Sequence, residues 1–157
     1  MVTISAYRSR VLALIALLGG LSACVNGAST AMNPDQSRQT LISEAKAVIQ
    51  AVFPGAEPLV VVQVTDAPCG GPVGTEHSKV ESGLNLHFDS PDHTLSSEKV
   101  FQKVVDVLKQ RGWTINYTSD NVAGAERRGF GGIQAGVGDA PVGINISGTT
   151  ECVDNPK

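Results

Sequence analysis

The chain has 157 residues, of which 41% are hydrophobic, and its 15 acidic and 12 basic residues give a formal charge of −3. A chain of this length accommodates one domain. Its Lys and Arg residues form no dense cluster, which excludes the basic surface by which most proteins bind nucleic acid.

Residues 1–23 have the layout of a secretory signal peptide. Arg8 and Arg10 precede an apolar run that begins at Val11, and small residues follow the run up to Ala23. The run is shorter than the roughly 20 apolar residues that a membrane-spanning helix needs. We therefore expect removal of residues 1–23, which leaves 10 basic and 15 acidic residues and a formal charge of −5.

The end of this leader, Leu21-Ser22-Ala23-Cys24, resembles a lipobox, in which the cysteine thiol receives a diacylglyceryl group before cleavage. Two acyl chains hold a protein firmly in a bilayer, whereas an acidic chain gains nothing from anionic lipids. The interpretation is that Cys24 is the lipid-carrying first residue, which holds the protein on the extracytoplasmic face of the cell membrane. The alternative is a chance cysteine after a conventional leader.

Residues 24–35 are small and polar without an apolar period, which predicts a flexible tether, and residues 36–157 are expected to form a single α+β domain. A first helix is predicted over 35–53, capped by Asn33 or Asp35 and ended by Pro54 and Gly55. Glu44 is assigned to the solvent-exposed face of this helix. Its apolar face comprises Leu41, Ile42, Ala45, Val48, Ile49 and Val52.

Two strands are expected next. The β-branched run 59–64 predicts a central strand, and the Pro- and Gly-rich stretch 68–72 predicts a loop. In the segment 80–89, Leu84, Leu86 and Phe88 alternate with Asn85 and His87, which indicates a strand with one solvent-exposed face.

A second helix is predicted from Ser96 to Gly112, followed by a strand in which Trp113, Ile115 and Tyr117 face the core. Residues 130–146 predict a glycine-rich hairpin that turns at 138–141. The expected fold is an antiparallel or mixed sheet of about five strands with two helices packed on one face, in the order α-β-β-α-β-β-β.

The uncovered face of such a sheet is a candidate binding surface. The side chains assigned to it are Asn85, His87, Thr114, Asn116, Thr118, Asn145 and Ser147.

Cys69 and Cys152 remain once Cys24 carries lipid, and an exported chain normally pairs its cysteines. A disulfide between them is the favoured interpretation. Two free thiols, or a metal site shared with histidines, are the alternatives.

Several short motifs together resemble the LppA-type lipoproteins of mycobacteria, a family of cell-envelope proteins without an established activity. They are the lipobox, the helix end Phe53-Pro54-Gly55, Cys69-Gly70-Gly71, Gly112-Trp113 and the stretch from Ser147 to Cys152. The resemblance implies membrane attachment and a bridge between Cys69 and Cys152, and it supplies no catalytic residues.

The sequence contains neither a Gly-x-Ser-x-Gly elbow nor a His-Glu-x-x-His helix, and we predict no catalytic residue and no cofactor. His87 and Asp89 share a strand face and are weak candidates for a metal site, with His77, His93 and Asp92 nearby in sequence. Turn formation near Pro91 explains several of these residues equally well.

The predicted function is therefore that of a non-enzymatic envelope lipoprotein whose domain binds a protein or a wall component. A carrier of a small ligand or lipid, with an apolar slot between helices and sheet, is the first alternative. A metal-dependent enzyme is the second.

Overall fold

The computed structural model describes residues 32–70, 72 and 77–156. Cys24, the leader and most of the predicted tether lie outside these residues. The elements are α1 (Pro34–Val52), β1 (Leu59–Gly70), β2 (Lys79–Asp89), α2 (Ser97–Gln110), β3 (Thr114–Ser119), β4 (Val122–Arg127), β5 (Gly131–Asp139), β6 (Val142–Thr149) and β7 (Val153–Asp154). The α+β class is confirmed, but the strands number seven rather than about five.

The first helix begins in a capping box. The Asn33 side chain accepts a hydrogen bond from the Gln36 backbone N–H at 2.9 Å, and the Gln36 side chain accepts one from the Asn33 N–H at 3.2 Å. Both bonds satisfy donors that the first turn of a helix leaves unpaired. Pro34 occupies the first turn, where no amide hydrogen is needed. The helix thus begins two residues inside the predicted tether.

The second helix is capped by the Ser96 side chain, which accepts from the Lys99 backbone N–H. It ends before Gly112, whose φ of 82° is the left-handed conformation that favours glycine after a helix. Val104 and Leu108 on its apolar stripe are fully buried. Both helices therefore form where the sequence predicted them.

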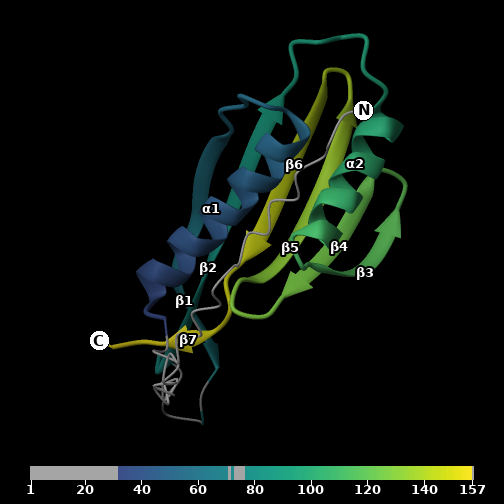
Figure 1. The fold of residues 1–157 in the computed structure, drawn as a ribbon. Helices are drawn as coiled ribbons and strands as arrows, with labels where there is room; N and C mark the ends of the chain where they lie inside the picture. The colour runs from purple at the N-terminus through teal and green to yellow at the C-terminus, as the bar shows by residue number, and fades with distance from the viewer. Residues whose placement is uncertain (1–31, 71, 73–76, 157) are drawn as a thin grey trace, which may run out of the picture.

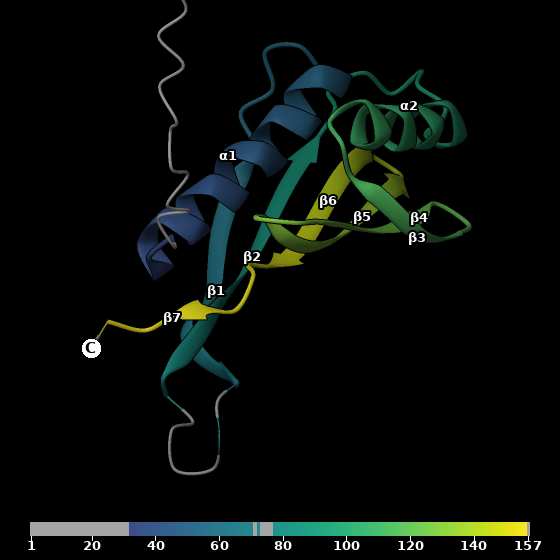
Figure 2. The ribbon, with the colours of Figure 1, turned by 60° about the horizontal axis from the view of Figure 1, so that its bottom comes forward.

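The sheet has the strand order β1-β2-β6-β5-β4-β3, and β7 pairs with the start of β2. Every pairing is antiparallel. Figures 1 and 2 show both helices on one side of the sheet, α1 over β1 and β2 and α2 over β5 and β4. We call this side the covered face and the opposite side the open face.

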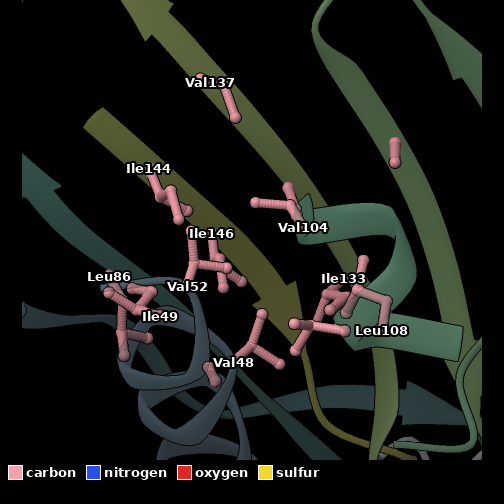
Figure 3. Packing of buried hydrophobic residues seen from close by; sticks show 14 of the residues in the cluster. Val48, Ile49, Val52, Leu86, Val104, Leu108, Ile133, Val137, Ile144 and Ile146 are labelled. Carbon is pink, nitrogen blue, oxygen red and sulfur yellow. The ribbon is translucent and has the colours of Figure 1, made fainter. Parts of the chain in front are cut away.

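The hydrophobic core fills the space between the helices and the covered face (Figure 3). Val48 and Ile49 of α1 and Leu108 of α2 meet strand residues that are equally inaccessible to solvent. The strand residues with no exposed surface are Leu84, Leu86, Ala123, Ala135, Ile144 and Ile146. On β2, β5 and β6, alternate positions enter the core, as expected for a sheet covered on one side.

The strand predicted to be central, 59–64, is instead an edge strand, because β1 pairs only with β2. A run of β-branched residues fits a central strand and an edge strand equally well. At the edge, Leu59, Val61, Val62 and Val64 keep between 42% and 66% of their surface exposed. The strand also continues through Pro68 to Gly70, where we expected a loop, since edge strands tolerate proline.

Residues 122–127 form a strand that the sequence did not predict. Their side chains are mostly Ala, Gly and charged groups, which have low strand propensity. Asp120, with a φ of 49°, lies in the tight turn that folds β4 back on β3. The predicted glycine-rich hairpin corresponds to β5 and β6.

The predicted disulfide is confirmed between Cys69, near the end of β1, and Cys152, between β6 and β7. The Cα atoms are 5.8 Å apart and the cysteines are separated by 83 positions. The bridge joins the two ends of the chain segment that contains most of the sheet. It therefore restricts a long loop in the unfolded chain.

Candidate binding groove on the open face

The open face presents polar side chains along its central strands. Asn85 of β2 lies opposite Ser147 of β6, and His87 lies opposite Asn145. These positions alternate with Leu86 of the covered face, so their side chains leave the sheet on the open side. The structure thus brings together the polar residues of two strands that are about 60 positions apart in sequence.

Hydrogen bonds among these side chains orient them. The Asn85 amide Nδ2 donates to Oδ1 of Asn145 at 3.1 Å and to Oγ of Ser147 at 3.0 Å. On the other half of the sheet, Nε2 of Gln134 donates to the hydroxyl oxygen of Tyr117. Each amide and hydroxyl retains further donor or acceptor capacity, because a side-chain amide has four hydrogen-bonding positions.

Glycines make up much of the floor of the open face. They alternate with buried positions in the strand registers and are Gly83, Gly124, Gly132, Gly136, Gly138 and Gly143. Glycine in a strand allows another group to approach the backbone closely. At Gly124 that group is the ring of Tyr117, since a methyl group on Gly124 would lie 2.0 Å from the ring atom Cε1.

A groove of about 590 Å³ crosses this face. It runs from Gln63 and Val64 on β1, over Ser147 and Gln134, to Tyr117 on β3. Ala67 and Thr149 also line it, which places it in the half of the sheet nearest the disulfide. Its volume is within the range of small-molecule binding sites.

The charged residues that line the groove are acidic. Glu81 of β2 and Glu126 of β4 contribute to its wall, and no Lys or Arg is among the described residues that line it. Carboxylates accept hydrogen bonds and repel anions. The groove is therefore suited to neutral or cationic ligands.

Most of the side chains predicted for a binding face lie on the open side. Asn116 lines the groove, and Thr114 lies opposite Glu126. Thr118 does not join them, because it lies opposite the buried Ala123 and belongs to the covered side. A β-bulge at Asn116 inserts one extra residue into β3 and reverses the alternation.

The same bulge places Tyr117 on the open face, whereas the sequence assigned it to the core. Tyr117 has 47% of its surface exposed. Gln134 and the glycines of β5 were not predicted as site residues either. The sequence does contain a signal that could have placed them on the open face. In β5 they alternate with the apolar residues Ile133, Ala135 and Val137.

The candidate metal ligands His87 and Asp89 contact each other, with Nε2 and Oδ2 3.0 Å apart, beside a shallow hollow of about 290 Å³. His77 and His93 lie beyond opposite ends of the 11-residue strand β2, which is roughly 35 Å long. Within residues 32–70, 72 and 77–156, no three His, Cys, Asp or Glu side chains are grouped so that they could hold a metal ion.

A second polar cluster, not predicted from the sequence, lies on the covered side. Glu44 was assigned to the wet side of α1 but is 8% exposed. Its carboxylate accepts from Nε and Nη2 of Arg111, both at 2.8 Å, from Nη1 of Arg127 at 3.0 Å, and from Nε1 of Trp113 at 3.3 Å. The Arg111 hydrogen bonds, with help from Trp113 and the charge of Arg127, lower the pKa of Glu44 despite its burial.

This cluster joins α1 to the end of α2 and to β4. The guanidinium of Arg127 also lies 3.9 Å from the ring centre of Phe130, a cation–π contact. Arg127 thereby ties the end of β4 to α1 through Glu44. We assign the cluster to stability of the fold.

No protein family, curated protein or solved structure matches the chain significantly. Among the helices of the described residues, none is both long enough and apolar enough to cross a membrane.

Proposed function

We propose that this chain is a lipid-anchored protein of the cell envelope whose folded domain is a non-catalytic binding module. The anchor is Cys24, within the lipobox-like sequence at the end of the leader. The binding surface is the groove on the open face. The observation that carries the proposal is this groove: a sheet face left uncovered, floored by glycines and lined by oriented amides and hydroxyls.

The lining groups support binding rather than chemistry. Gln63, Gln134 and Ser147 are neutral hydrogen-bonding groups, and Val64 and Tyr117 add apolar surface. A few placed polar groups on an otherwise apolar concave surface are what ligand sites commonly contain. The fixed sheet beneath them keeps these groups in place without a ligand, which limits the entropy lost on binding.

The position of the groove agrees with attachment through residue 24. Arg38, in the first half of α1, donates to Oγ of Ser82 at 3.3 Å, so α1 begins at the end of the sheet that carries the disulfide. Residues 24–33 reach at most about 35 Å when fully extended. The groove therefore lies in the half of the domain to which the tether is joined.

The anchor is tested by the intact mass of the full-length gene product extracted from membranes. The expected mass corresponds to loss of residues 1–23 and addition of a diacylglyceryl group to Cys24. A mature chain with an unmodified Cys24 thiol would overturn this part of the proposal.

The binding surface is tested by photo-crosslinking in intact cells. A benzophenone amino acid replaces Gln134, which is exposed on the open face, or Gln102, which is exposed on α2. We expect a specific crosslinked product from position 134 and none from position 102. Equal labelling from both positions, or none from position 134, would contradict a binding function of the groove.

A further inference from the structure

The ring of Tyr117 is held in a single place on the floor of the groove. A methyl group on Gly124 would lie 2.0 Å from Cε1, 2.5 Å from Cδ1 and 2.7 Å from Cζ of that ring, so the ring lies directly over the glycine backbone. Its hydroxyl is fixed by the Gln134 amide. With 47% of the residue exposed, the ring presents an apolar surface to the groove.

Such a ring is prepared for stacking. Tyr offers a large apolar area with few rotatable bonds, and here its orientation is already determined by Gly124 and Gln134. Sugar rings have an apolar face of C–H groups surrounded by hydroxyls. An aromatic ring beside amide and hydroxyl groups matches both parts of that surface.

Charge narrows the class of ligand. Glu81 and Glu126 line the groove, and the described lining contains no Lys or Arg. Polyanions such as nucleic acids and phosphate polymers would be repelled. Hydroxyl and acetamido groups both donate hydrogen bonds, and carboxylates and amide oxygens such as those of Gln134 accept them.

We propose that the groove binds a neutral, N-acetylated glycan chain of the cell wall, an inference that rests on the proposed binding function. One sugar ring stacks on Tyr117. Gln134 hydrogen-bonds to its polar substituents, Ser147 hydrogen-bonds to those of a neighbouring sugar, and Glu81 and Glu126 accept from hydroxyls along the chain. The glycines of the floor allow the glycan to approach the strand backbone.

The test is calorimetric titration of the detergent-solubilised full-length protein with a linear tetramer of N-acetylglucosamine. We expect saturable binding. Tyr117→Ala is expected to weaken it about tenfold or more, because truncation of a central aromatic contact often has an effect of this size. Tyr117→Phe keeps the ring and should retain most of the affinity.

A filled groove provides a control that does not depend on loss of a contact. A Cβ on Gly132 meets only the carbonyl oxygen of Ala125, at 4.0 Å, so Gly132→Thr fits the strand but projects into the groove. Gly136 lies on the same strand and face but outside the groove, and its Cβ would meet Val122 at 3.8 Å. We expect Gly132→Thr to abolish tetramer binding and Gly136→Thr to retain it. Thermal melting curves should show that both variants are folded.

Three outcomes separate the claims. If the tetramer does not bind at millimolar concentration while position 134 still crosslinks in cells, the glycan inference is wrong and the binding function stands. If Gly132→Thr and Gly136→Thr reduce tetramer binding equally, the tetramer does not occupy this groove and the inference is wrong. If neither tetramer binding nor crosslinking occurs, both proposals are wrong.

Discussion

The two faces of the sheet share the same strands yet differ in nearly every physical property. On β6, Ile144 and Ile146 are fully buried against the helices, while Asn145 and Ser147, which alternate with them, point to the open face. The covered face is apolar and closely packed. The open face carries glycines, amides and hydroxyls.

This difference places the stability of the fold on the covered face and, in the proposed function, binding on the open face of the same sheet. Burial of apolar surface on the covered face supplies most of the favourable free energy of folding. The open face contributes little to it, so its residues are free to serve recognition. Substitutions at neighbouring positions of one strand should therefore have very different effects.

The largest expected effect comes from the covered face. Ile146→Ala should lower the free energy of unfolding by about 2–5 kcal/mol, because it leaves a cavity among fully buried side chains. Asn145→Ala, one position away, should change it by about 0.5 kcal/mol or less, since its bond to Asn85 is exposed to water. Urea denaturation of both variants measures the contrast. Similar losses for the two would contradict the division between the faces.

The next largest loss of stability is expected from a substitution in the polar cluster around Glu44 on the covered side. Glu44→Ala leaves two guanidiniums and an indole N–H without their acceptor, and we expect a loss of about 2–3 kcal/mol. Asp154→Ala is the matched control, because it breaks an exposed ion pair with Lys79 worth about 0–1 kcal/mol. Comparable denaturation midpoints for the two variants would show that the Glu44 cluster does not support the fold.

The pH dependence of the unfolding free energy gives a second test of the contribution of Glu44 to stability. The pKa of Glu44 is lowered in the folded protein, chiefly by the Arg111 hydrogen bonds, from an ordinary value of 4.5. Its contribution is therefore complete above about pH 4.5 and is lost as the pH falls through the lowered pKa. The difference in unfolding free energy between wild type and Glu44→Gln, measured from about pH 7 to about pH 2, should be constant and then shrink. A difference that grows in acid would refute the assignment.

The covered face is the part that sequence predicts best. Apolar residues at helical spacing identify α1 and α2 and the sides they bury, and alternation identifies β2. The disulfide also follows from the cysteine count together with the expectation that the chain is exported. These features depend on local periodicity or on composition, both of which are visible in a single sequence.

The open face is predicted less well, because its geometry depends on pairings and bulges. One extra residue at Asn116 exchanges the sides of Tyr117 and Thr118, and no local signal marks that bulge. Burial of Glu44 likewise depends on Arg111 and Arg127, which are 67 and 83 positions away in sequence. The edge position of β1 is decided by strand order, which its own residues do not specify.

A smaller effect on stability than at Ile146 or Glu44 is expected at Tyr117. The ring covers Gly124 on the neighbouring strand, and an aromatic side chain over a strand glycine contributes by excluding water from the backbone. Tyr117→Ala should therefore lower the free energy of unfolding by about 0.5–1 kcal/mol, and Tyr117→Phe by less. Thermal or urea unfolding of the two variants measures this. A loss as large as that of Ile146→Ala would mean that Tyr117 belongs to the core. A small loss instead means that a change in affinity at this position reports on the groove itself.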